Sequence, residues 1–179
     1  MSLPKSKSSL PLVPPIEADY SRPAGNDFDT LARDRIPIRS MTADDLSAIV
    51  RIDRHITGRD RKAYYARKLD EALAESAVRV SLVAELDDRV VGFIMARVDF
   101  GEFGSAEPLA VMDTIGVDPG YRNKGVAAGL FSQLVTNLAG LRVERVRTEA
   151  GWNDFGLLTF LDRMGFRPHR TLALRRPLV

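Results

Sequence analysis

The sequence predicts a single α/β domain in which helices flank a mixed β-sheet. Strand-like and helix-like apolar patterns alternate from residue 36 onward, an order typical of such a sheet. The chain has 179 residues, which suits one ordinary domain or a slightly smaller domain with a tail. Its 45% hydrophobic and 28% charged residues are typical of a globular protein.

The first 34 residues have a different composition from the rest of the chain. They hold five of the ten prolines and several serines, and they show no apolar periodicity. We therefore expect a flexible N-terminal arm over 1–34, followed by one folded domain over 35–179. An arm that binds a partner is the alternative interpretation.

The domain is predicted to begin with a strand and two helices. Ile36–Ser40 alternates apolar and polar residues, which predicts a short strand. The pattern Thr42-Ala-Asp-Asp45 matches a capping box and predicts a helix that continues to about Arg54. Asp60 can cap a second helix, roughly Arg61–Glu75.

The remaining elements alternate between strands and helices. Three strands follow the second helix, with a turn at Asp87-Asp88 between the first two, and they are predicted at Val78–Glu85, Val90–Val98 and Ala110–Val117. After a turn at residues 118–120, a helix, a strand, a helix and a last strand are predicted at Gly125–Leu138, Arg145–Glu149, Asp154–Met164 and Thr171–Arg175.

The composition excludes several kinds of site. The absence of Cys excludes disulfides, thiolate zinc sites, iron–sulfur clusters and a cysteine nucleophile. With His55 and His169 as the only histidines, we expect no metal site. A net charge of +2 gives no dense basic patch for nucleic acid. No apolar run approaches the ~20 residues of a membrane span, and no signal-peptide core is present. We therefore expect a cytoplasmic protein with no nucleic-acid or membrane partner.

The stretch from Ile115 to Ala127 carries the clearest chemical signal. A buried strand runs into a turn, and a short glycine-containing loop then opens a helix. The unpaired N–H groups and positive dipole end of a helix N-terminus form an anion site, especially for phosphates. Gly125 allows close approach, and Arg122 can add a charge-assisted contact. The alternative is a tight strand-to-helix turn without a ligand.

This stretch resembles the acyl-CoA-binding motif of the GCN5-related N-acetyltransferase (GNAT) family. The family pattern Arg/Gln-x-x-Gly-x-Gly/Ala is matched by Arg122-x-x-Gly125-x-Ala127. Two further segments, Val90–Ile94 and Phe160–Phe166, resemble the third strand and the end of the last helix of the family. The resemblance covers about residues 36–179.

The resemblance implies a fold, a cosubstrate and a binding site. Two parallel central strands should splay apart, and the pantetheine arm of acetyl-CoA should pair with the backbone between them. The pyrophosphate should sit on the N–H groups of the loop. The cofactor-binding residues implied are Ile115, Gly116, Val117, Arg122, Asn123, Lys124, Gly125, Val126 and Ala127. Family members often form dimers, so a homodimer is an expectation as well.

Asp113 is the first candidate for the general base that direct amine attack requires. It is an acid in an otherwise apolar strand, an even number of residues from Ile115 and Val117. It matches the position of a Glu in diamine acetyltransferases, although many family members carry their Glu where this chain has Val111. Glu107 is the second candidate and Glu149 a third. The alternative for Asp113 is a structural hydrogen bond to a loop.

The general acid and the acceptor are less well defined. Many family members have a Tyr that protonates the leaving thiolate, and Leu161 stands at that position, so no acid is assigned. The acceptor side should be built by residues 53–65 and 99–108, in which acids favour a cationic amine and arginines an anionic group. The candidate acceptor contacts are His55, Tyr65, Phe100, Phe103 and Trp152.

Three functions remain open from the sequence. The preferred one is an acyltransferase that acetylates a small-molecule primary amine. The second is a protein acetyltransferase acting on lysines or N-termini. The third is an acyl-CoA-binding module without turnover, which is plausible because Leu161 stands where many family members have the Tyr that protonates the thiolate.

Overall fold

The structure is a computed structural model that describes residues 35–73, 79–100, 107–170 and 176–178. The predicted arm over 1–34, the predicted last strand at Thr171–Arg175 and the candidate acceptor contact Phe103 lie outside these residues. No helix within the described ranges is long and apolar enough to span a bilayer.

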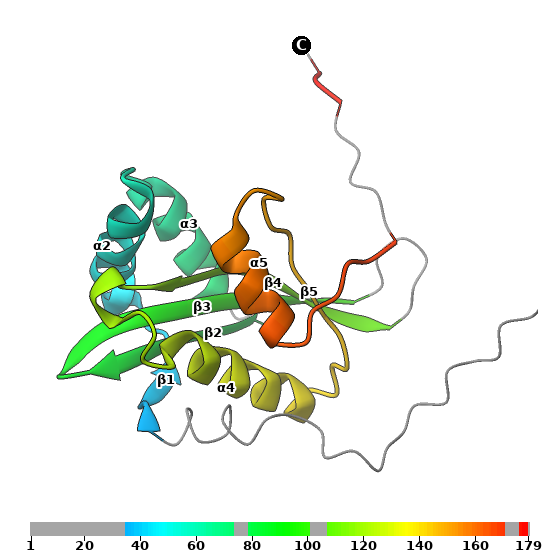
Figure 1. Cartoon of the computed structure of the whole chain (residues 1–179), viewed down its shortest axis with the longest axis horizontal. Coiled ribbons are helices and arrows are strands. Elements are labelled where there is room, and N and C mark those ends of the chain that lie inside the picture. The colour runs from blue at the N-terminus through cyan, green and yellow to red at the C-terminus, as the bar shows by residue number, and fades with distance from the viewer. Residues whose placement is uncertain (1–34, 74–78, 101–106, 171–175, 179) are drawn as a thin grey trace, which may run out of the picture.

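The described part of the chain forms one mixed sheet, as predicted (Figure 1). Its five strands lie side by side in chain order: β1 (Ile38–Ser40), β2 (Arg79–Leu86), β3 (Arg89–Phe100), β4 (Pro108–Val117) and β5 (Val146–Arg147). The first four are antiparallel neighbours, and β4 pairs with β5 in parallel. The turn between β2 and β3 has positive φ at both Asp87 and Asp88, which suits a tight hairpin.

Helices cover both faces of the sheet (Figure 1). The two short 3₁₀ turns are η1 (Ala43–Asp45) and η2 (Pro119–Tyr121), and the α-helices are α2 (Leu46–Thr57), α3 (Lys62–Leu73), α4 (Val126–Gly140) and α5 (Phe155–Arg163). One core lies between the sheet and the pair α2 and α3, and the other lies between the sheet and α4, with residues of α5 packed against it.

Strand β3 is apolar along most of its length because it contributes to both cores. Phe93 and Met95 pack toward α2 and α3, whereas Ile94 and Ala96 pack toward α4. This alternation follows from the two-residue period of side-chain direction in a strand. All residues from Val90 to Ala96 are accordingly buried.

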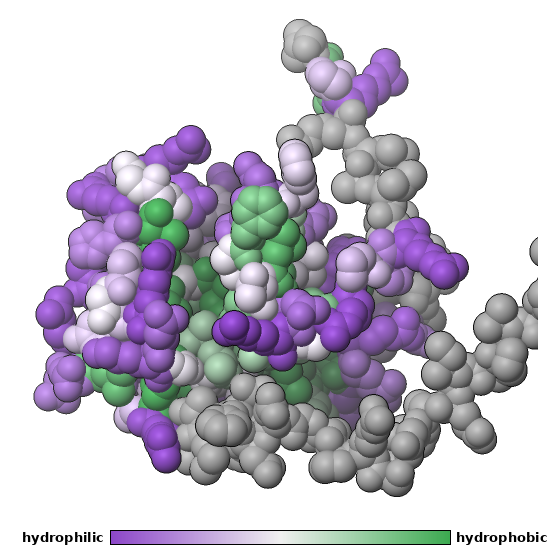
Figure 2. Space-filling view, viewed as in Figure 1, coloured by the Kyte–Doolittle hydropathy of each residue, from purple (hydrophilic) through white to green (hydrophobic). Residues whose placement is uncertain are grey.

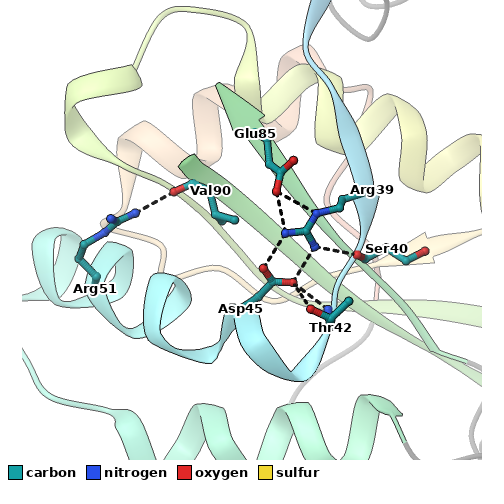
Figure 3. Close-up of polar contacts among 7 residues, drawn as sticks. All are labelled: Arg39, Ser40, Thr42, Asp45, Arg51, Glu85 and Val90. Atoms are coloured by element: carbon teal, nitrogen blue, oxygen red, sulfur yellow. Dashed lines mark hydrogen bonds and ion pairs between the residues drawn. The ribbon is translucent and has the colours of Figure 1, made fainter. Parts of the chain in front are cut away.

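An ion-pair cluster around Arg39 joins β1 to its neighbours (Figure 3). The Arg39 guanidinium donates to both carboxylate oxygens of Asp45 at 2.8 Å and to Oε1 of Glu85 at 2.9 Å. Asp45 also accepts from the Thr42 N–H at 2.7 Å, so it fixes the start of the first helical segment. Burial raises the pKa of Asp45, but the hydrogen bonds from Arg39 and Thr42 outweigh it and leave the pKa lowered.

The parallel pair β4 and β5 is short, and the two strands then separate. Ala110 pairs with Val146 and Val111 with Arg147, after which the Thr148 hydroxyl donates to the Met112 carbonyl at 3.0 Å. The predicted strand Arg145–Glu149 therefore forms only over Val146–Arg147, because the chain beyond it leaves the β4 ladder. From residue 113 to residue 117 the edge of β4 on this side has no partner strand within the described residues.

Candidate active site

The loop after β4 is held against the sheet by its own hydrogen bonds. Asp118 donates its N–H to the Val91 carbonyl at 2.8 Å, and its side chain accepts from the Gly120 N–H at 3.1 Å. Pro119 begins the 3₁₀ turn η2, where its missing N–H costs nothing. The loop therefore enters α4 from a fixed direction.

The loop ends in the left-handed backbone that a glycine favours. Asn123 has a φ of 60° and Gly125 a φ of 82°, both in the region that side chains with a Cβ rarely adopt. Gly125 is the N-cap of α4, and no side chain of the described residues caps this helix. The first N–H groups of α4 are therefore available to an anion.

The residues that the motif implies for the cofactor lie at the end of β4, in the loop after it and at the start of α4. Arg122, Asn123 and Lys124 are exposed, and the Lys124 ammonium lies 4.6 Å from the Tyr121 ring centroid. Gly125 and Ala127 are half-buried, and Val126 is buried under the loop. Ile115, Gly116 and Val117 are the last residues of β4 and lie on its open edge.

Gly92 positions the start of α4, a role that the sequence analysis missed. A Cβ at Gly92 would lie 2.7 Å from Cγ1 of Val126 and 3.2 Å from the carbonyl oxygen of Gly116. The missing side chain lets the first residue of α4 rest directly on β3. A glycine in the middle of an apolar strand was the available signal.

A β-bulge changes the direction of Asp113. Met95 pairs with Thr114 and Ala96 with Met112, which leaves Asp113 without a partner on β3. Asp113 contacts Lys68 of α3, whereas Ile115 packs against the core on the α4 side. Despite their even spacing, Asp113 and Ile115 therefore lie on different faces of the sheet, because the extra residue shifts the alternation.

Asp113 is the centre of a group of charged side chains between α3, β3 and β4. Its Oδ2 lies 3.2 Å from the Lys68 ammonium, and its Oδ1 accepts from the Arg97 guanidinium. Arg97 also donates to Oδ1 of Asp99 at 3.1 Å. Both oxygens of Asp113 are thus engaged by cations, so an incoming amine must displace one of these contacts to reach the carboxylate.

A cluster of three polar side chains lies beside the site, between α2 and α3. The Tyr65 hydroxyl donates to Oδ1 of Asp53 at 3.0 Å, and the Arg61 Nε donates to Oδ2 of Asp53 at 2.9 Å. Burial raises the pKa of Tyr65 to about 12. The hydrogen bond to Asp53 raises the pKa of Arg61, although burial opposes it. Tyr65 is 1% exposed and packs edge-on against Phe93, so it lies inside the core beneath the site.

His55 lies near the C-terminal end of the open edge of β4. Its Nδ1 is 3.7 Å from Oδ2 of Asp118, at the end of β4, so the last turn of α2 borders the glycine loop. The neighbouring Ile56 lies near Gly116, where a Cβ would be 3.4 Å from its Cδ1. Figure 2 shows the surface hollowed between the α2–α3 pair and α5, on the side where β4 lacks a partner.

The other candidate residues are distributed more widely. Trp152 is 85% exposed just before α5, and Phe100 is exposed at the end of β3. Glu107 precedes β4 and pairs with Arg145. Six residues of extended chain, about 20 Å, separate it from Asp113, so the two candidate bases do not share one position. Leu161 is buried in the core, and its position offers no proton donor.

The mixed sheet, the separated strands β4 and β5 and the uncapped helix after β4 match the arrangement that the GNAT resemblance implies. The family model for the Acetyltransferase (GNAT) family matches residues 46–166. This match covers more than half of the chain, and the chain belongs to this family of acetyltransferases, which use acyl-CoA. Comparison with curated protein sequences finds no match.

Solved structures share the fold at low sequence identity. Aminoglycoside N-acetyltransferase AAC(6')-Iy in complex with CoA has a TM-score of 0.68 and 17% identity, over 80% of this chain and 95% of its own. AAC(6')-Ih from Acinetobacter baumannii has a TM-score of 0.68 and 17% identity, over 80% and 99%. A transcriptional regulator from Bacillus halodurans has a TM-score of 0.67 and 17% identity, over 79% and 99%.

Proposed function

We propose that this acetyltransferase transfers an acetyl group from acetyl-CoA to a primary amine by direct attack of the amine on the thioester. The main support is the open edge of β4, which leads through η2 and the glycine loop to the uncapped N-terminus of α4. An extended pantetheine arm can pair with such an edge, and a pyrophosphate suits such a helix end.

The proposed cosubstrate site uses backbone groups more than side chains. The peptide groups of Ile115–Val117 pair with the pantetheine arm, and the N–H groups of Asn123–Ala127 hold the pyrophosphate. Arg122 and Lys124 are exposed beside these groups and add positive charge. Because a bulky side chain at Gly125 would crowd this approach, the glycine is a specific requirement of the site.

Asp113 is the proposed general base. An alkylamine resembles a Lys side chain, whose pKa is near 10.4, and it must lose a proton before it attacks a carbonyl carbon. Asp113 lies at the bulge where β4 parts from β5, so its carboxylate is near the reacting end of the proposed pantetheine site. We assign no general acid, and Glu107 remains the second candidate for the base.

The preferred acceptor is a small-molecule amine. The support is indirect: two of the structures with this fold are aminoglycoside N-acetyltransferases, which by name act on small-molecule amines. The hollow between α2–α3 and α5 offers a bounded space on that side of the molecule (Figure 2). His55 borders this space near the cosubstrate loop, and Trp152 and Phe100 are exposed and remain proposed contacts.

The test is the release of free CoA in the presence of acceptors. Aminoglycosides, diamines and amino-acid amides are compared with lysine peptides and peptides with free N-termini. Thiol release that depends on a small amine, with peptides at the background rate, supports the proposal. Release with peptides alone would assign a protein acceptor instead, and no release with any amine would contradict the proposed transfer.

A further inference from the structure

Lys68 occupies the position in which a substrate amine would meet the proposed base. Its ammonium reaches from α3 to within 3.2 Å of Oδ2 of Asp113, across 45 residues of sequence. The two side chains are mostly buried, with exposed fractions of 19% for Lys68 and 13% for Asp113. A primary alkylamine is therefore held at hydrogen-bond distance from the carboxylate that is proposed to deprotonate the acceptor.

The other lysines of the described residues have different surroundings. Lys62 is exposed near the start of α3, and Lys124 is exposed over the Tyr121 ring. Within the described part of the chain, neither forms a hydrogen bond or ion pair with Asp113, so position relative to the carboxylate distinguishes Lys68 from both. These two residues provide internal references on the same chain.

We propose that Lys68 is a self-acetylation site, and that its acetylation frees one oxygen of Asp113 for the external acceptor. This inference rests on the proposed function, because it requires acetyl-CoA on the open edge of β4. The contact with Asp113 already orients the Lys68 amine, whereas an external amine must acquire this orientation when it binds.

The transfer balances without any further reactant. Lys68 gives a proton from its ammonium to Asp113, and the neutral Nζ attacks the acetyl carbonyl carbon of acetyl-CoA. An N–C bond forms while the C–S bond breaks, and the electron pair leaves on the sulfur of CoA. The attacking nitrogen loses a second proton to the departing thiolate as the amide forms, and the proton on Asp113 passes to water, which restores the carboxylate.

Acetylation changes the surroundings of Asp113 in a defined way. The amide formed at Lys68 carries no positive charge and cannot form the ion pair with Oδ2. Arg97 remains on Oδ1, so the carboxylate keeps its orientation while Oδ2 becomes available to an incoming ammonium. The unmodified enzyme should therefore show a lag in acceptor turnover that disappears after incubation with acetyl-CoA.

The experiment measures acetylation of each lysine by peptide mass after the full chain is incubated with acetyl-CoA without an amine. The native chain is compared with heat-denatured chain, with Lys68→Arg and with Asp113→Asn. We expect Lys68 to be modified at least ten times faster than Lys62 and Lys124. The rate per molecule should be independent of protein concentration, and heating or Asp113→Asn should suppress it.

Two further measurements separate failure of this inference from failure of the proposed function. Acetyl-CoA binding is measured by calorimetry on the same samples, and Lys68→Gln is assayed for the lag. Binding without selective modification of Lys68, or an unchanged lag in Lys68→Gln, would overturn the self-acetylation proposal alone. No binding of acetyl-CoA would overturn the proposed function and this inference together.

Discussion

Asp113 shows how one unpaired residue can redirect the chemistry of a strand. The bulge turns its carboxylate toward α3, where Lys68 and Arg97 meet it, instead of toward the core under α4. The two cations orient this carboxylate, but they also occupy the lone pairs that a base needs. For Asp113 to act as the general base, its contact with Lys68 must therefore open during the reaction.

Replacing Asp113 by Asn tests the role of the carboxylate. The variant keeps the size and some of the hydrogen bonds of the side chain but cannot accept a proton from an amine. We expect kcat to fall by about 10²–10⁴ while the Kd for acetyl-CoA is unchanged. Steady-state rates across pH provide the measurement, and an unchanged kcat throughout would remove Asp113 from the mechanism.

Asp45 gives the clearest pH dependence at the level of one residue. Its pKa in the folded chain is below the ordinary value of 3.8, so its ion pair stabilises the fold above that pH and is lost as pH falls through the folded pKa. Asp45→Asn should lower the free energy of unfolding by about 1–3 kcal/mol at pH 7. The difference should shrink at a pH below 3.8, as measured by urea unfolding at both pH values. A difference that does not change with pH would contradict this role.

The contact between α4 and the sheet determines where the proposed anion-binding helix end lies. Gly92 has no side chain, and Val126 fills the space that a Cβ would need. The bulge and the strand separation likewise arise from pairings between segments rather than from local sequence. The geometry of the site is thus a property of how the elements meet.

Gly92→Ala should weaken cosubstrate binding through this contact. The added methyl group must displace Val126 or the Gly116 backbone, at a cost of about 1–3 kcal/mol. We expect a higher Kd for acetyl-CoA with an unchanged KM for the acceptor. Gly140→Ala is the matched control, because a Cβ there meets nothing within 4 Å. Equal acetyl-CoA affinity in a folded Gly92→Ala variant would show that the contact does not position the loop.

Local patterns predicted the elements well, whereas contacts between distant segments could not be predicted. The two-residue and 3.6-residue periods placed the described strands and helices near their observed positions, and the glycine loop before α4 remains a predicted anion site. The two-residue period does not indicate the face of Asp113, because a bulge depends on the partner strand. The Lys68 contact joins residues 45 positions apart, and no spacing rule indicates it.

At the scale of the whole molecule, the two cores on either side of one sheet explain how the site is held. Residues from α2 and α3 form one core and residues from α4 form the other, and β3 contributes to both. Strand β4 is supported on both faces of the sheet, while its open edge from residue 113 to residue 117 has no partner strand among the described residues. The fold therefore keeps the proposed cosubstrate site open without loosening the strand that carries it.

Removal of residues 1–34 should leave this architecture intact. The buried residues described for the two cores lie between Ile36 and Leu161. We expect the truncated chain to melt cooperatively, within a few degrees of the full chain. Calorimetric melting of both chains is the measurement, and loss of a cooperative transition would assign the arm a structural role.

The most direct test of the central claim is a calorimetric titration of acetyl-CoA into the wild-type chain and into Gly125→Val, with ATP as a control ligand. Gly165→Val is the matched control variant, because Gly165 has a φ of 84° against 82° for Gly125 but lies after α5. The account predicts saturable binding of acetyl-CoA and not of ATP to wild type and Gly165→Val, and loss of binding in a folded Gly125→Val. No saturable binding to the wild-type chain, or equal binding in Gly125→Val, would contradict the claim that the β4–α4 loop holds the cosubstrate.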